Sequence, residues 1–131
     1  MIDTSAMIAA LIATHEFHAI ARPHLRSSTR VPAIVLAETY AQLRRTFSQP
    51  AEIADVLLRT WTNDEDRILG TDAIVVRSVF GRAVELNLGG DIHDALVAQT
   101  CVAHDVPLVT LDRRQHRIAL ALGARSTYLL A

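Results

Sequence analysis

Short apolar segments, each followed at once by a helical pattern, place the tightest constraint on the fold of this chain. The clearest case is residues 107–111 (PLVTL), which are followed by Asp112 and a helical pattern over 113–122. Shorter apolar segments end at Asp3 or lie at 29–32, 67–70 and 127–130. Short strands that alternate with helices predict βα units and a parallel sheet covered by helices on both faces. We therefore expect a helix-rich, three-layer α/β/α domain with a short-stranded, mainly parallel central sheet.

The helical patterns fill most of the remaining chain. We expect helices at 5–13, 15–28, 33–47, 50–61, 71–86, 91–104 and 113–122. Pro23 falls in the middle of the second pattern, where it removes a backbone donor. In the third helix, the apolar spacing predicts that Ile34, Ala37, Ala41 and Leu43 face the core.

Length and composition restrict the class of protein. With 131 residues, 50% of them hydrophobic and no linker or repeat, the chain is expected to form one domain over 1–131. All 13 positive residues are Arg and the net charge is −1, so no global basic field indicates nucleic acid. The apolar run near the start is too short to cross a membrane. Together with the single Cys101, which excludes a disulfide framework, this predicts a cytoplasmic protein.

Four acidic residues from distant parts of the sequence are expected at one edge of the sheet. Asp3 and Asp112 each end a strand, Asp94 lies in the first turn of the helix over 91–104, and Glu38 lies near the second turn of the helix over 33–47. The carboxyl ends of parallel strands and the N-termini of the following helices share the edge at which ligands bind. These four carboxylates are therefore our candidate site.

Four neighbouring carboxylates repel one another unless a cation lies among them. Ligation by oxygen alone, without His or Cys, favours Mg²⁺ or Mn²⁺ over Zn²⁺. Such an ion can activate water and neutralise a phosphodiester, so the pattern indicates metal-assisted phosphodiester hydrolysis. Simpler interpretations stay open: Asp3 and Asp112 are also suited to cap helices, and Asp94 lies three residues after Asp91, as in a capping box. Asp91 is interpreted mainly as a helix cap and secondarily as a fifth metal ligand.

Four segments resemble the PIN-domain nucleases, and among them the VapC-like toxins of VapBC toxin–antitoxin pairs. They are IDTSA (2–6), PAIVLAETYAQLRR (32–45), HDALVAQT (93–100) and LVTLDRR (108–114). Their order and spacing, which span almost the whole chain, carry the resemblance more than any single segment does. The family usually has a longer first strand than the two residues that precede Asp3 here.

The resemblance implies a PIN-like fold and a Mg²⁺- or Mn²⁺-dependent endoribonuclease that cuts structured RNA such as tRNA or rRNA. Matched residue by residue, the acidic site is Asp3, Glu38, Asp94 and Asp112, supported by the hydroxyls of Thr110 and Ser5. A VapB-like antitoxin and a homodimer are the implied partners.

Three arginines after Asp112 are candidates for holding RNA phosphates: Arg113, Arg114 and Arg117. Two competing hypotheses remain. One is a receiver-like signalling domain that binds Mg²⁺, although such domains usually use a Lys and this chain has none. The other is a catalytically silent PIN-like module that only binds a partner.

Overall fold

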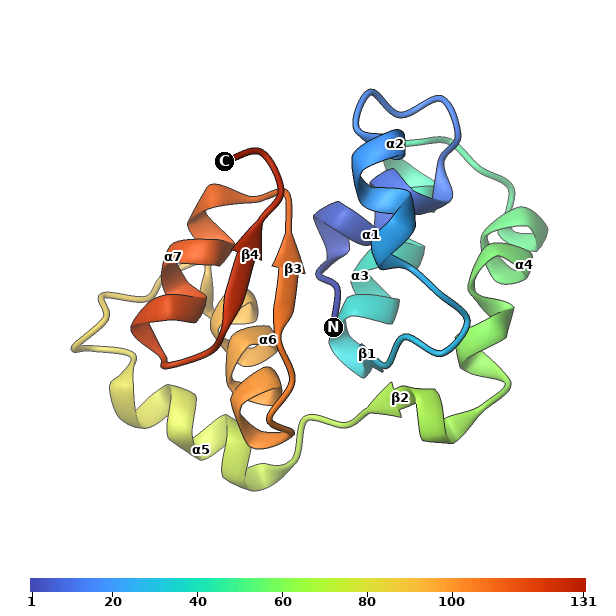
Figure 1. Ribbon diagram of the computed structural model, residues 1–131. Coiled ribbons are helices and arrows are strands. Elements are labelled where there is room, and N and C mark those ends of the chain that lie inside the picture. Colours follow the sequence, from blue (N-terminus) through green and yellow to red (C-terminus); the bar gives the residue numbers. More distant parts are fainter.

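The computed structural model describes residues 1–131 and contains seven α-helices with short strands between them. Figure 1 shows two groups of elements with the N-terminal segment between them. The first group comprises α1 (Thr4–Leu11), α2 (His18–Ala21), β1 (Val31–Pro32), α3 (Ala33–Arg45), α4 (Ala51–Thr62) and β2 (Ile68–Leu69). The second comprises α5 (Ala73–Arg82), α6 (Ile92–Ala103), β3 (Leu108–Thr110), α7 (Arg113–Ala121) and β4 (Ser126–Tyr128). The predicted helix-rich α/β class with short parallel strands is confirmed.

All strand pairing is parallel, but it is divided between two small sheets. β1 pairs with β2, and β3 pairs with β4. The expected first strand is reduced to a single bridge between Ile2 and Val109. Backbone bonds on either side of this bridge, from Asp3 N–H to the Val109 carbonyl (3.1 Å) and from Val109 N–H to the Met1 carbonyl (2.8 Å), hold the N-terminal segment against β3. Asp3 therefore lies beside the end of β3.

The helix expected over 15–28 is wrong in its length. The structure has only α2 and the 3₁₀ helix η1 (Arg22–His24) in this region. Pro23 lies inside η1, where its missing N–H prevents an α-helix from continuing. A second 3₁₀ helix, η2 (Glu65–Arg67), leads into β2.

The predicted inward face of α3 is only partly right: Leu43 is buried and Ile34 packs against the core, but the centre of the buried face lies elsewhere. The buried residues are Val35, Leu36, Thr39 and Leu43, whereas Ala37 is exposed. The true face follows the spacing 35, 39, 43, which includes a threonine and therefore looked polar. Glu38 directly precedes the buried Thr39 and lies half-buried at the border of this inner face.

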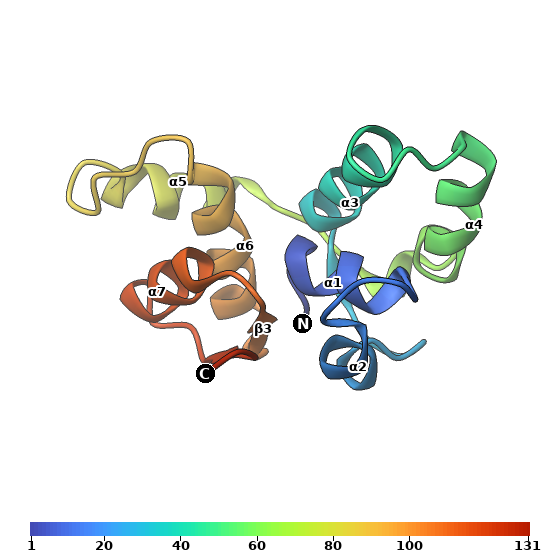
Figure 2. The ribbon, with the colours of Figure 1, turned by 90° about the horizontal axis from the view of Figure 1, so that it is seen from above.

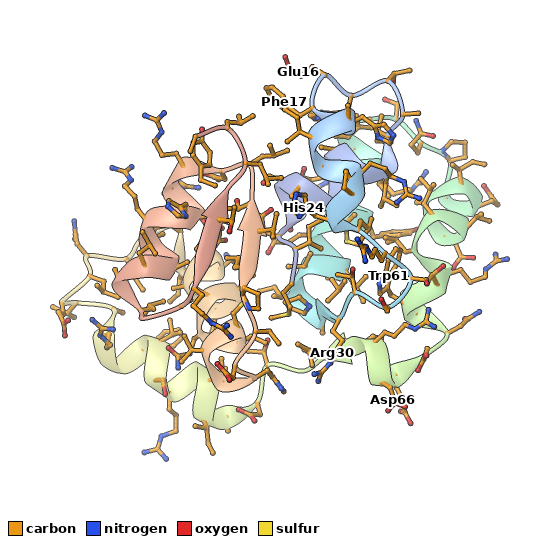
Figure 3. All side chains as sticks on the ribbon, in the orientation of Figure 1. Glu16, Phe17, His24, Arg30, Trp61 and Asp66 are labelled. Carbon is orange, nitrogen blue, oxygen red and sulfur yellow. The ribbon has the colours of Figure 1, made fainter.

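The core is built mainly from small aliphatic side chains of α1, α3 and α6, with one large aromatic residue. Trp61 is only 5% exposed, and its indole N–H donates to the Thr29 carbonyl (2.8 Å). Figure 3 shows this side chain between α4 and the segment that precedes β1. Trp61 thus packs inside the first group of helices. None of the helices combines the length and hydrophobicity needed to span a bilayer.

Candidate active site

The four predicted acids line one cavity of about 200 Å³, called here the acid cavity. Each comes from a different helix: Asp3 precedes α1, Glu38 lies in the second turn of α3, Asp94 in the first turn of α6, and Asp112 precedes α7. Figure 2 shows α1 and α3 on one side of the molecule's middle and α6 and α7 on the other. The acid cavity therefore lies between the two groups of elements and is lined by residues of both.

Asp3 is held more firmly than the other acids. It is 4% exposed, and one carboxylate oxygen accepts the Ala6 backbone N–H (2.9 Å), which caps α1. Ser5 Oγ donates to the carboxylate (2.8 Å), and the hydroxyl of Thr110 donates to Oδ2. Burial nevertheless raises the pKa of Asp3 to about 6, against these hydrogen bonds and with a further increase from Asp112. The free-energy cost of removing this carboxylate from water therefore exceeds the stabilisation that its hydrogen-bond donors provide.

Thr110 links the first and the last of the four acids. This residue is fully buried at the end of β3, and its hydroxyl accepts the backbone N–H of Asp112 (2.8 Å) while it donates to Asp3. One hydroxyl therefore fixes both the Asp3 side chain and the turn that presents Asp112. Ser5 adds a second connection, because its oxygen accepts the Leu111 N–H (3.1 Å).

Asp112 caps a helix and lines the cavity at the same time. Its Oδ1 accepts the backbone N–H groups of Arg114 (2.8 Å) and Gln115 (3.4 Å) at the start of α7. Its negative charge raises the pKa values of both Asp3 and Asp94. Capping and a place in the acid cavity, which were alternatives on sequence grounds, are both present.

Asp94 carries a buried carboxylate oxygen without a hydrogen-bond donor. Its Oδ2 has no hydrogen-bond partner, although the Arg114 Nε lies 3.4 Å away as an ion pair. Burial raises the pKa of Asp94 to about 6; Arg114 opposes this shift, and the nearby charges of Asp112, Glu38 and Asp91 add to it. A buried polar atom left unpaired is rare in proteins and indicates a missing ligand or water.

Glu38 is held by a single side-chain hydrogen bond. Its Oε2 accepts a long hydrogen bond from the Thr4 hydroxyl (3.5 Å). Burial raises the pKa of Glu38, while the charge of His93 and the Thr4 bond act in the opposite direction. A carboxylate with few partners and a raised pKa is suited to exchange a proton with a bound water.

The donor set fits a hard divalent cation that keeps part of its water shell. The acid cavity offers carboxylate oxygens without His or Cys, and Asp94 Oδ2 lacks a hydrogen-bond partner. No group of three His, Cys, Asp or Glu side chains is close enough together to enclose an ion directly. Mg²⁺ is commonly bound through one or two carboxylates, with water filling its other positions. The side chains therefore fit an ion held partly through water.

The structure places the remaining predicted residues in different surroundings. Asp91 does not line the acid cavity; its side chain accepts the Gly89 N–H (2.8 Å) and makes no bond to the helix that it precedes. Arg114 lines the acid cavity, whereas Arg117 lines a neighbouring one. Arg113 lies over the ring of Tyr128, 5.6 Å from its centre, and lines neither. Only Arg114 of the three arginines therefore contacts the cavity that holds the acids.

Four further residues of the acid cavity were not singled out from the sequence: Thr4, Gln42, Val97 and Gln115. Gln115 is the most informative, because it is 2% exposed and donates to the Asp94 carbonyl (2.9 Å). It lies three residues after a helix cap, a spacing that signals a capping box. Its side chain instead connects α7 to α6 and so fixes the distance between Asp112 and Asp94.

The fold and the cavity can now be compared with known proteins. The PIN domain family matches residues 1–120. The chain belongs to the PIN-domain family. It is 32% identical over 115 residues to Ribonuclease VapC40 of Mycobacterium tuberculosis, which covers 86% of this chain and 85% of the relative. The resemblance to PIN-domain, VapC-like proteins predicted from the sequence is therefore confirmed.

Two solved structures share the fold of this PIN-domain chain at low identity. The structure of FitAB bound to an IR36 DNA fragment matches with a TM-score of 0.73 and 16% identity, covering 99% of this chain and 94% of that one. FitAcB from Neisseria gonorrhoeae matches with a TM-score of 0.69 and 17% identity, covering 98% and 96%. Membership of the PIN family excludes the receiver-like hypothesis, because receiver domains have a different, flavodoxin-like sheet.

Proposed function

We propose that this protein is a divalent-metal-dependent endoribonuclease, the toxin of a toxin–antitoxin pair, that hydrolyses structured RNA such as tRNA or rRNA. The observation that carries the proposal is the acid cavity, in which four carboxylates share about 200 Å³ and one buried oxygen has no hydrogen-bond donor. The similarity to a protein named as a ribonuclease supports the same activity. We propose Asp3, Glu38, Asp94 and Asp112 as the catalytic residues.

Asp3, Asp94 and Asp112 would hold the ion, Mg²⁺ or Mn²⁺, partly through its water molecules, with Glu38 completing its shell or orienting a water. When bound, the ion supplies positive charge that neutralises the phosphodiester and makes water a better nucleophile. It would also relieve the repulsion that raises the pKa of Asp94. A cation would therefore stabilise a cluster of carboxylates that otherwise repel one another.

Other residues of the chain would transfer the proton, bind the phosphate and position the acids. Glu38, with its raised pKa, is placed to accept a proton from the attacking water. Arg114 is 59% exposed in its side chain, so it can leave Asp94 and contact a phosphate oxygen of the RNA. Thr110 and Ser5 hold Asp3 in position and so act as positioning residues rather than catalytic ones.

A VapB-like antitoxin, a homodimeric form and a cytoplasmic location belong to the same proposal. They follow from the family resemblance. Co-purification of the chain with the product of a small neighbouring gene, followed by measurement of the mass of the complex, tests both partners.

The activity is tested by incubating the purified protein with folded tRNA and rRNA, with Mn²⁺, with Mg²⁺ or with a chelator. We expect internal cleavage with either ion and none with the chelator. Cleavage that persists in the chelator would contradict the metal site. Metal binding without cleavage of any RNA would favour the catalytically silent binding module instead.

A further inference from the structure

A second cavity lies directly beside the acid cavity and has a different chemical character. Its volume is about 340 Å³. It is formed by the connection between α5 and α6 and by one face of α7. Apolar side chains and charged groups share its lining, namely Leu86, Leu88 and Ile118 with Asp91, Arg114 and Arg117.

Arg114 makes the two cavities neighbours, because it lines both. Its Nε lies 3.4 Å from the Asp94 carboxylate on the side of the acid cavity. Because one arginine lines both cavities, we expect the nucleoside next to a phosphate at Asp94 to lie beside the second cavity. Arg117 lies one turn further along α7 and makes no ion pair within the protein, so its guanidinium is free to contact a phosphate.

The lining matches the parts of a nucleotide. Proteins that read RNA place unstacked bases against apolar or aromatic side chains and hold the flanking phosphates with arginine. The cavity's size also falls in the range of sites for small ligands, which begins at about 300 Å³. The apolar part of the lining suits a base, and the two arginines suit the phosphates on either side of it.

Asp91 is the only acid in this lining. Its Oδ1 accepts the Gly89 N–H (2.8 Å), which fixes the carboxylate and leaves acceptor positions for a ligand. A carboxylate pairs best with a base that offers two neighbouring N–H donors on its Watson–Crick edge. Guanine offers such a pair, whereas uracil offers a single donor between two carbonyls that would repel the acid.

We propose that the second cavity binds one unstacked nucleobase of the RNA next to the scissile phosphate, and that Asp91 selects guanine over uracil there. This inference rests on the proposed ribonuclease function. It gives Asp91 a role as a specificity-determining residue instead of a metal ligand.

The test uses a pool of RNA hairpins with randomised loops, cleaved with Mn²⁺ at about pH 8, where Asp94 is ionised in every variant. Sequencing of the new ends is expected to show guanosine enriched about tenfold over uridine at one position beside the cut, since a bidentate contact discriminates by that order. Asp91→Asn is expected to cleave with this enrichment lost. Arg117→Gln is expected to raise KM several-fold with kcat nearly unchanged, whereas Arg59→Gln, an exposed arginine on α4, is the matched control.

The same base profile in the wild type and Asp91→Asn, or equal KM values for Arg117→Gln and Arg59→Gln, would overturn the inference and leave the ribonuclease function standing. Absence of metal-dependent cleavage by the wild type would overturn the proposed function. In that event, guanosine monophosphate and uridine monophosphate are titrated onto each protein. Tighter binding of the guanosine compound by the wild type, lost in Asp91→Asn, would support the cavity independently, and equal binding would refute it.

Discussion

Replacing Asp3 by Asn is expected to make the metal-free protein more stable while it removes the activity. In the unfolded chain the pKa of Asp3 is near its ordinary 3.8, and burial raises it to about 6 in the folded protein. Above pH 6 the folded state therefore carries a buried charge that costs about 3 kcal/mol, from about two pKa units at 1.36 kcal/mol each.

The substitution preserves most of the local structure. Asn is as good a helix cap as Asp, so its oxygen can still accept the Ala6 N–H. Its amide would face the Thr110 hydroxyl, which must then accept a bond rather than donate one, at a cost of about 1 kcal/mol. The net gain in the free energy of unfolding is therefore about 2 kcal/mol at about pH 8.

The sign of the pH dependence follows from the raised pKa of Asp3. As the pH falls through about 6, the folded wild type takes up a proton before the unfolded chain does, and the wild type gains stability. The stability advantage of Asp3→Asn should therefore be lost near pH 4, where only the cost of about 1 kcal/mol at Thr110 remains and the wild type becomes the more stable protein. Urea unfolding monitored by the fluorescence of Trp61, the chain's only tryptophan and a buried one, measures the difference in stability. A variant that is less stable than the wild type at about pH 8, or one that is still more stable than the wild type at about pH 4, would refute the reasoning.

Three further outcomes are expected. Because the pKa values of Asp3 and Asp94 are both about 6, the affinity for Mn²⁺, measured calorimetrically, should fall steeply below pH 6; a constant affinity down to about pH 5 would exclude these ligands. Thr110→Val should lower the free energy of unfolding by about 1–3 kcal/mol, because the Asp112 N–H and Asp3 each lose a partner; an unchanged urea midpoint would contradict the bonds described. Arg114→Gln should raise the pKa of Asp94 further, since Arg114 opposes the shift, which NMR titration of the carboxylate can measure; an unchanged or lowered pKa would contradict this role of the ion pair.

The convergence of the four acids on one cavity could be predicted from the sequence because it depends on topology. Asp3 and Asp112 each follow the end of a strand segment, and parallel pairing brings such ends together even when the strands are as short as the Ile2–Val109 bridge. What local patterns could not give is the tertiary environment. The inner face of α3 includes the polar residue Thr39, which is fully buried, so apolar spacing alone identified Leu43 correctly but also selected Ala37, which is exposed.

The surroundings of individual side chains could not be predicted from the sequence either. Asp91 and Asp94 are three residues apart, one just before α6 and one in its first turn, yet only Asp94 lines the acid cavity, because the turn before α6 directs Asp91 back to the Gly89 N–H. The role of Gln115 depends on how closely α7 approaches α6. Neither fact follows from spacing along the chain.

Cleavage of folded RNA by Asp94→Asn tests the central claim most directly. The exchange removes one charge at the buried oxygen that lacks a donor, with almost no change in shape. Asp66→Asn is the matched control, since Asp66 is exposed on η2, outside the acid cavity (Figure 3). With Mn²⁺ present, we predict that Asp66→Asn cleaves like the wild type and that Asp94→Asn is folded but inactive. Undiminished cleavage by purified Asp94→Asn would contradict the account.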